Sequence, residues 1–528
     1  MTLANQPKLK SAAESVASAS DLPEGWVDTT LDQLLQGLES GSRPKGGVRG
    51  ITEGIPSIGG EHLNENGGFR FESIKFVPYS FFERMNQGHI QTGDILIVKD
   101  GATTGKVALV RKDFPYNPAV VNEHVFICRP AEGVYSPLLF YFLFSKEGQD
   151  RILNNFRGSA QGGINQSFAP GTDVPLAPLA EQKRIVAKVE ELLTRVNATR
   201  ERLAKVKEIL KCFGQSVLVA ACSGRLTEDW RAEQPDLESA QYFLDQVANK
   251  RIWEYEAECK KAREEQQKIP RKPSNLQPRE VDIDGLPKLP DGWGWSYLPY
   301  LGYMNRGKSQ HRPRNAAHLY GGPYPFIQTG DIAQSGGHIR IHRQTYSEVG
   351  LAQSRLWPAG TVCITIAANI ANSAILTYPA CFPDSVVGVI TDADLCLPEY
   401  LEYFIRTARA ALDQFAPATS QKNINIAILN DVAVPLPSPS EQEEIVRRVS
   451  MLFKLADAIA KQVATAGERA ERLTQAILAK AFRGELVPTE ADLARREGRS
   501  HEPASSLLAK IKEQRKYTNL KRKRSVAF

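Results

Sequence analysis

The sequence predicts an α/β protein in which two mixed α/β domains, in a pseudo-two-fold arrangement, are joined by two long helices that form an antiparallel coiled coil. Three observations predict this class. The chain has 528 residues, which is too long for one hydrophobic core. It repeats itself once, and each copy ends in a long stretch with apolar residues on a heptad spacing.

The internal repeat is visible as matched segments. "LPEGW" at 22–26 returns as "LPDGW" at 289–293, and "PLAPLAEQKRIVAKVEELL" at 175–193 returns as "PLPSPSEQEEIVRRVSMLF" at 435–453. Such a period is far longer than a solenoid repeat. We therefore expect a duplicated unit, with a divergent globular region followed by a long helix that diverged less.

The repeat sets the expected domain boundaries. These are a leader over 1–20, a first globular domain over 21–174, a long helix over 175–228, a charged helix and Pro-rich linker over 229–288, a second globular domain over 289–434, a second long helix over 435–488, and a C-terminal helix with a basic tail over 489–528.

The two helices carry the strongest local pattern. Apolar residues recur in alternating steps of four and three, which is typical of a left-handed coiled-coil seam. The seam residues are Ile185, Val189, Leu192, Val196, Leu203, Val206 and Leu210 in the first copy, and Ile445, Val449, Leu452, Ile459, Val463, Leu473 and Ile477 in the second. Both helices are expected to end at a glycine, Gly224 or Gly484, and Ser440 with Glu443 predicts a capping box at the second start.

The length of these helices bears on what covers the seam. Each is roughly 65 Å long at 1.5 Å per residue, whereas a domain of 150 residues is only about 30 Å across. A helix of this length extends past its own domain, so we expect the two seams to pair. The alternative is that each helix packs only on its own domain.

One stretch resembles a phosphate-binding loop. "GDILIVKDGATTGKVALV" at 93–110 has an apolar run before a Gly-rich turn, but Gly101 and Gly105 are four residues apart where the loop needs five, and Val107 stands where Ser or Thr binds magnesium. The second copy has "IAANIANS" there, without glycine or lysine. We interpret the stretch as a turn between strands and expect no ATPase site.

Composition excludes other classes of protein. No apolar run approaches the roughly 20 residues of a membrane span, and the first 20 residues lack the apolar core of a signal peptide. The seven cysteines form no C-x-x-C pair, which is typical of a reduced, cytoplasmic protein. No metal-ligand cluster and no catalytic motif stands out, so we expect a non-enzymatic binding scaffold without a cofactor of its own.

The charge distribution indicates that any surface that binds nucleic acid is a local basic patch. Residues 489–528 hold 11 Lys and Arg against 5 Asp and Glu, which accounts for the whole net charge of +6. In the second domain a basic stretch over 306–355 precedes an acidic one over 384–402, and we expect the two to form separate faces. The candidate DNA-binding residues are Arg43, Lys45, Lys99, Lys106, Arg111 and Lys112 in the first domain, and Arg306, Lys308, Arg312, Arg314, Arg340, Arg343 and Lys422 in the second. An ordinary solvated charge is the alternative for each.

A polar loop recurs in both copies, with Gln161 and Asn165 in the first and Gln421, Lys422 and Asn423 in the second. Because two domains that read different DNA sequences should differ in their base-reading residues, a loop kept in both favours a structural or backbone-positioning role.

The sequence resembles the specificity subunit of type I restriction-modification enzymes. The likeness is carried by "GSAQGGINQ" and "ATSQKNINI", each followed by a proline-rich strand, "EQxxIV" and a long helix, and it covers roughly residues 21–520. It implies two target-recognition domains, each reading one half of a bipartite, asymmetric site in double-stranded DNA, with helices that set the gap between the halves.

The resemblance also implies partners. Two methyltransferase subunits would dock on this subunit and two restriction (translocase) subunits would join them, so that S-adenosylmethionine, ATP and magnesium belong to those partners. Two alternatives stay open from the residues themselves: a coiled-coil adaptor for proteins alone, or a DNA-processing enzyme whose site is unrecognised.

Overall fold

The computed structural model describes residues 22–158, 162–367, 371–414 and 426–525. It divides into two compact units. One is formed by the chain up to Leu203 together with the chain from Thr465 onward, and the other by Ala204–Ala464. Among the described helices, none combines the length and the apolar character that crossing a membrane requires. Each unit contains one globular head, which we call head 1 and head 2.

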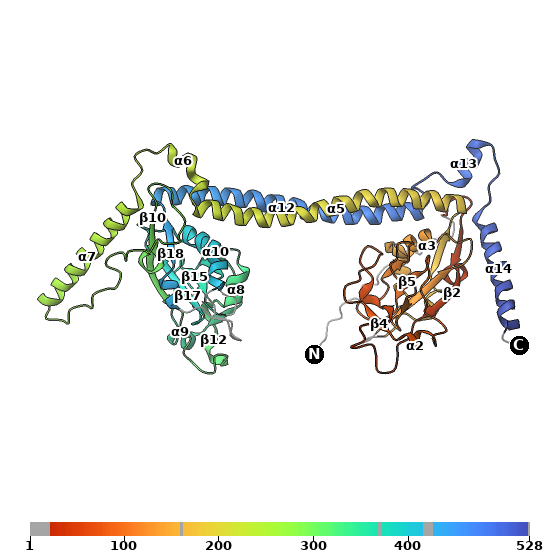
Figure 1. The fold of residues 1–528 in the computed structure, drawn as a ribbon, viewed down its shortest axis with the longest axis horizontal. Coiled ribbons are helices and arrows are strands. Elements are labelled where there is room, and N and C mark those ends of the chain that lie inside the picture. The colour runs from red at the N-terminus through yellow and green to blue at the C-terminus, as the bar shows by residue number, and fades with distance from the viewer. Residues whose placement is uncertain (1–21, 159–161, 368–370, 415–425, 526–528) are drawn as a thin grey trace, which may run out of the picture. The chain divides into compact units, whose positions relative to one another are not determined.

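Head 1 is built on two small sheets (Figure 1). The larger has four antiparallel strands in the order β2–β8–β5–β6, and the smaller has three in the order β4–β3–β7. Their bounds are β2 Leu35–Ser40, β8 Val125–Pro130, β5 Ile95–Val98, β6 Val107–Leu109, β4 Lys75–Val77, β3 Ile55–Ile58 and β7 Val120–Val121. The helices of the head are α1 Leu31–Leu34, α2 Tyr79–Phe82, α3 Ser136–Phe144 and α4 Lys146–Leu153, and α3 packs against β6.

Head 2 repeats this plan. Its larger sheet has the order β11–β17–β15–β16–β13, and β12 pairs with β14. The strands are β11 Gly302–Arg306, β17 Val386–Thr391, β15 Val362–Thr365, β16 Ser373–Leu376, β13 His338–Ile339, β12 Tyr320–Phe326 and β14 Gln344–Tyr346. The helices are α8 Thr329–Gln334, α9 Glu348–Ala352, α10 Pro398–Gln414 and α11 Ile426–Asn430.

Strand register makes the heads comparable residue by residue. Ile97 of β5 pairs with Phe126 of β8, as Ile364 of β15 pairs with Val387 of β17. The Gly-rich stretch at 99–106 is the turn of the β5–β6 hairpin, where Gly101 and Gly105 have φ of 91° and 87°. This confirms the turn, since glycine adopts positive φ without steric cost.

A two-stranded ribbon joins each head to a long helix. In head 1, β1 Val27–Thr30 pairs with β9 Asp173–Leu176, and in head 2, β10 Gly294–Tyr297 pairs with β18 Ala433–Leu436. These ribbons lead into α5, Leu179–Cys222, and α12, Pro439–Phe482, each of 44 residues.

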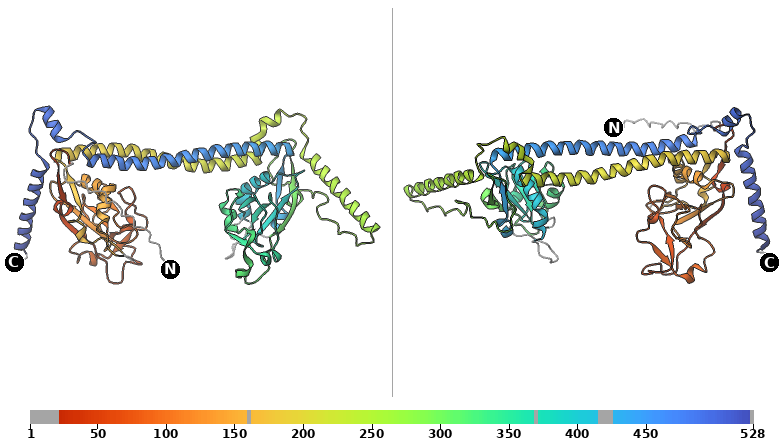
Figure 2. Two further views of the ribbon diagram at one scale, coloured as in Figure 1. Left: turned by 180° about the vertical axis from the view of Figure 1, so that it is seen from behind. Right: turned by 45° about the horizontal axis from the view of Figure 1, so that its top comes forward.

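The long helices run antiparallel in both units, and their segments lie side by side in Figures 1 and 2. In unit 1, Arg184 of α5 contacts Glu490 beyond the end of α12, and Arg200, further along α5, contacts Glu471, earlier in α12. In unit 2, Arg448 of α12 donates to the Leu226 carbonyl just past α5. The fold class predicted from the sequence is thereby confirmed in each unit.

Burial along the helices largely follows the seam. Ile185, Val189, Val196, Ile445, Val449, Val463 and Ile477 are buried, and Leu192, Leu203, Val206, Leu210, Leu452 and Ile459 are half-buried. Leu473 is 51% exposed, so its placement in the seam is wrong. Thr474 is buried instead and accepts a hydrogen bond of 3.1 Å from Arg200. A helix of 3.6 residues per turn drifts against a 3.5-residue repeat, which moves the buried face by one position here.

The helix ends differ in how well the sequence predicts them. Gly224 and Gly484 follow α5 and α12 with φ of 73° and 72°, which confirms the glycine stops. The capping box at Ser440 is wrong, because α12 begins at Pro439 and the Ser438 hydroxyl accepts the Glu441 amide at 3.3 Å.

The segments after the long helices complete the cores. In unit 2, η3 Arg225–Thr227, α6 Glu228–Ala232 and α7 Ala240–Glu264 follow α5, and in unit 1, α13 Glu490–Glu497 and α14 Ala504–Ser525 follow α12. Leu244 and Val247 lie in the core of unit 2, as Leu508 and Ile511 lie in that of unit 1. Helix α14 extends through 519–524, where the sequence led us to expect a tail.

Candidate nucleic-acid interface

Three of the basic candidates in head 1 project from turns. Arg43 follows β2, and its Nε lies 2.8 Å from Oε1 of Glu123, with the arginine side chain 53% exposed. Lys45, in the next turn, and Lys112, after β6, are exposed. These side chains are accessible to a ligand at the surface of the head, with Arg43 held in an ion pair by Glu123.

The other three candidates in head 1 make ion pairs or ring contacts within the protein. Lys106 Nζ is 2.6 Å from Glu65 and only 13% exposed, and Lys99 packs over the Phe126 ring at 5.7 Å. Arg111 binds Glu190 of α5 at 2.9 Å, so it ties the head to the long helix. Contact with DNA would have to break these interactions.

Four candidates of head 2, Arg306, Lys308, Arg312 and Arg314, lie at the end of β11 and in the segment that follows it. Nη2 of Arg314 is 3.0 Å from both carboxylate oxygens of Asp384, and Nε of Arg306 donates to the Asp384 carbonyl at 2.9 Å. Arg312 donates to the carbonyls of Ser309 and His311 at 2.8 Å, while Lys308 is exposed.

The expected separation of a basic face from an acidic one is wrong. Asp384 lies among the arginines of head 2, and Glu402 is buried and bound to Arg406. The physical reason is that strand pairing brings Asp384, which precedes β17, next to the end of β11. A charge run in the sequence therefore does not correspond to a charged face.

The connection between β13 and β14 carries the remaining basic candidates of head 2. Arg340 is exposed, and Arg343 lies 3.5 Å from Asp331 and donates to Gln334. Arg355, in the same basic stretch, stacks on Tyr303 and Trp357, 4.6 and 4.4 Å from the ring centroids.

The recurrent polar loop is only partly described. Lys422, Gln161, Gln421 and Asn423 lie outside the described residues. Asn165 lies at the start of η2, Gln166–Phe168, and its Oδ1 accepts the Ser167 amide at 3.0 Å. In head 1 this asparagine therefore caps a turn.

Sequence reasoning missed the acidic partners, Glu123 and Asp384. Glu123 is a single acid in a loop, whereas Asp384 begins the acidic stretch that we expected on a separate face, and nothing local marks either one as the partner of an arginine. The one available signal was their place in the repeat, immediately before the matching strands β8 and β17.

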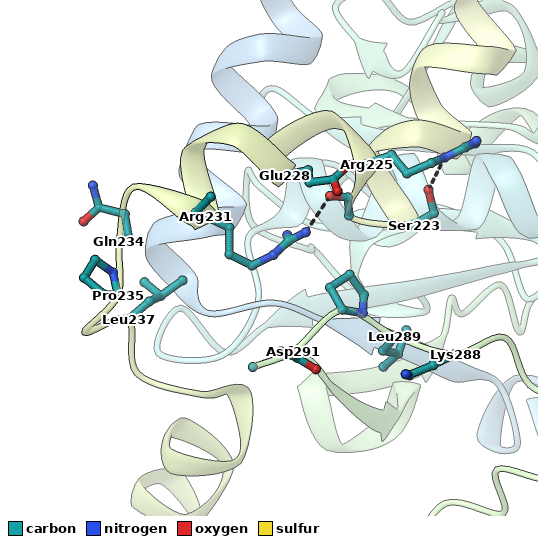
Figure 3. Close-up of a pocket in the computed structure, with 14 residues that line it drawn as sticks. Ser223, Arg225, Glu228, Arg231, Gln234, Pro235, Leu237, Lys288, Leu289 and Asp291 are labelled. Atoms are coloured by element: carbon teal, nitrogen blue, oxygen red, sulfur yellow. Dashed lines mark hydrogen bonds between the residues drawn. The ribbon is translucent and has the colours of Figure 1, made fainter.

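A second set of polar residues fixes the start of each long helix to its head. At head 2, Glu441 is buried and accepts hydrogen bonds from Trp293 at 2.9 Å, from Thr227 at 2.7 Å and from Arg231. Arg231 also donates to the Gly224 carbonyl beside a cavity of about 740 Å³ (Figure 3).

At head 1 the same joint is made by Glu181, which accepts from Trp26 at 2.9 Å and from the Glu490 amide at 2.8 Å. Burial raises the pKa of Glu181, against the lowering effect of these hydrogen bonds. The tryptophans of the two LP-x-G-W repeats thus anchor equivalent helix starts.

Clusters of metal-ligating side chains and the cysteines were the remaining candidates for a site. In the part of the chain that the structure describes, no group of three or more His, Cys, Asp or Glu is arranged to hold a metal ion. Of the seven cysteines, Cys128, Cys259, Cys363, Cys381 and Cys396 are buried.

Comparison with known proteins gives a consistent picture. The family model "Type I restriction modification DNA specificity domain" matches residues 23–208 and 305–466. The EcoKI specificity subunit of Escherichia coli K12 is 28% identical over 512 residues, covering 94% of this chain and 97% of the relative. The EcoBI specificity subunit of Escherichia coli is 27% identical over 498 residues, covering 89% and 90%.

A solved structure supports the fold. It comes from work on complex assembly and conformational transition of the type I R-M system, and it matches with a TM-score of 0.62 at 20% identity, covering 88% of this chain and 99% of the other.

Proposed function

Since this chain belongs to the type I restriction-modification DNA specificity family, we propose that each of its two heads reads one half of a bipartite, asymmetric site in double-stranded DNA. The observation that carries this proposal is the repeated strand order and register of the two heads, built from sequences that have diverged. A shared framework with different surface side chains suits two readers of different sequences.

The long helices would set the gap between the half-sites. Each helix contributes one end to each unit, and the two run antiparallel in both. Glu441 and Glu181 fix each helix start to its head. A DNA turn repeats every 34–36 Å or so, so a helix of roughly 65 Å is about as long as two turns of the duplex.

The partners would be two methyltransferase subunits and two restriction (translocase) subunits, with the whole assembly working on cytoplasmic DNA. Exposed apolar residues on the helices of unit 2 support docking of a partner there, namely Ile209, Met451 and Leu455. In this scheme the chain is not an enzyme. The methyltransferase supplies S-adenosylmethionine chemistry on an extruded adenine, and the restriction subunits use ATP and magnesium.

The test is footprinting of the chain mixed with its methyltransferase partner. We expect protection of two short, different sequences separated by a fixed gap, and no turnover of labelled DNA or ATP by the isolated chain. Complexes that form without a footprint would support the adaptor alternative. Turnover by the chain alone would support a DNA-processing enzyme.

A further inference from the structure

We propose that Glu123 and Asp384 are positioning residues that hold Arg43 and Arg314 for guanine reading, one arginine in each half-site. The inference rests on the proposed function and deepens it, because it assigns a base reader to each head. It starts from two ion pairs, Arg43–Glu123 in head 1 and Arg314–Asp384 in head 2.

The two acids occupy equivalent positions in the repeated sheet. Glu123 lies three residues before Phe126, which pairs with Ile97 of β5, and Asp384 lies three residues before Val387, which pairs with Ile364 of β15. Since β5 and β15 are the same strand of the duplicated unit, Glu123 and Asp384 project from the same loop of the two heads.

The arginines reach these acids by different routes. β2 and β11 also correspond, because Ser40 pairs with Phe126 and Arg306 with Val387. Arg43 comes three residues after Ser40, whereas Arg314 comes eight residues after Arg306. Two loops of different length and sequence thus deliver a guanidinium to the same carboxylate position, although neighbouring residues have diverged.

Each arginine keeps unused donors toward solvent. Arg43 uses Nε and Arg314 uses Nη2 for the carboxylate, and both side chains are about half exposed, at 53% and 50%. A guanidinium has five N–H donors, and a bidentate contact with guanine O6 and N7 needs only two of them. The carboxylate fixes the plane of the group, so less side-chain freedom is lost on binding.

The same acids disfavour a simple phosphate contact. A carboxylate about 3 Å from the guanidinium cancels most of its charge at a distance and repels a phosphate. It leaves the hydrogen-bond donors in place for a neutral base edge. Lys45 lies two residues after Arg43 and Lys308 six residues before Arg314; both are exposed and are better suited to the backbone of the duplex.

The experiment reads the methylated motif. The chain is expressed with its methyltransferase partner, and modified adenines are sequenced in the host genome for the wild type and for Arg43→Lys, Glu123→Gln, Arg314→Lys and Asp384→Asn. We expect about a ten-fold or larger loss of preference for guanine at one position. The loss should fall in one half-site for the first pair of variants and in the other half-site for the second pair.

Positioning is separated from reading by combining substitutions. If Glu123 acts only through Arg43, the double variant should lose no more preference than Arg43→Lys alone, and Glu123→Asp should restore part of it. The matched controls are Arg279→Lys in unit 2, whose partner is Asp431, and Arg151→Lys in unit 1, whose partner is Glu147. Both controls should leave the motif unchanged.

Contrary outcomes are distinct. An unchanged motif in both lysine variants overturns the inference but leaves the proposed function standing. Methylation that weakens uniformly across all sequences does the same, because it indicates a phosphate contact. Retention of the untouched half-site shows that a variant is folded. A wild-type complex with no two-part motif overturns the proposed function itself.

Discussion

Glu444 lies between two arginines of its own helix, α12. Its oxygens are 2.6 Å from Nε of Arg447 and 2.6 Å from Nε of Arg448, three and four residues further along. The hydrogen bond from Arg447 is the main cause that lowers the pKa of Glu444 to about 2. Burial has the next largest effect and opposes it, and the hydrogen bond from Arg448 lowers the pKa further. Arg448 also reaches Asp229, so the cluster links α12 to the segment after α5.

This cluster predicts a pH-dependent contribution to stability. Because the folded pKa of Glu444 lies below its usual value of 4.5, the ionised form stabilises the protein above about pH 4.5, and the effect is lost as the pH falls toward 2. Glu444→Gln should lower the free energy of unfolding by about 1 kcal/mol at pH 7, since pairs of this kind are weak. The difference between the thermal unfolding midpoints should shrink at pH 3.

The control is Glu443→Gln, which changes the exposed neighbouring carboxylate. It should change the free energy of unfolding by less than about 0.5 kcal/mol at either pH. A Glu444→Gln effect as large at pH 3 as at pH 7 would contradict the assignment.

At the scale of elements, the joint between a head and its long helix concentrates buried polar contacts. Glu441 is 1% exposed and is held by Trp293, Thr227 and Arg231. Removing the carboxylate leaves the half-buried Arg231 guanidinium with the Gly224 carbonyl but without its charged partner, and it leaves the Trp293 indole N–H without this acceptor, which is more costly than removing an exposed pair.

Glu441→Ala should therefore destabilise the protein by about 3 kcal/mol, whereas Trp293→Phe, which removes one hydrogen bond, should cost about 1 kcal/mol. Thermal unfolding followed by circular dichroism measures both. Glu443→Ala is the matched control on the same helical turn. Equal losses for Glu441→Ala and the control would show that the joint does not hold the head.

The same elements show what a sequence can predict. The heptad spacing locates α5 and α12, and the glycine stops follow from backbone sterics at Gly224 and Gly484. These are local properties, and so is the β5–β6 turn.

The missed features depend on contacts between residues far apart. The Arg43–Glu123 and Arg314–Asp384 pairs span 80 and 70 residues, so no local pattern marks them. The seam residue Leu473 is misplaced because drift between the helical and heptad periods is decided by packing against Arg200 and its neighbours. The roles of Lys106 and Arg111 likewise come from acids distant in the sequence.

At the scale of the whole molecule, the proposed gap depends on helix length. Removing one heptad from each helix, residues 206–212 and 455–461, keeps the seam in register and shortens the pair by about 10 Å. With about 3.4 Å per base pair, the gap in the methylated motif should shrink by about three base pairs while both half-sites stay the same. Replacing the two heptads with others of the same length is the control. A gap that does not change would contradict the spacing role.

The C-terminal segment of the chain contacts head 1, which lies near the start of the sequence. The Ala504 amide donates to the Gly25 carbonyl at 2.8 Å, and Arg495 lies 2.7 Å from Glu24. In head 2 the equivalent contact comes from the middle of the chain, because the Ala240 amide at the start of α7 donates to the Gly292 carbonyl at 2.8 Å.

Because each head is completed by an equivalent segment, the fold should tolerate circular permutation, in which the original termini are joined and new ones are opened elsewhere. Because α14 carries the chain about 31 Å from Ala504, beside Gly25, to Ser525, a flexible tether of about 32 Gly and Ser residues, with a span of about 31 Å, would join Ser525 to Leu22. New termini open at the exposed Gly285. This circular permutant should unfold at the same temperature and methylate the same motif, although head 2 is now translated first.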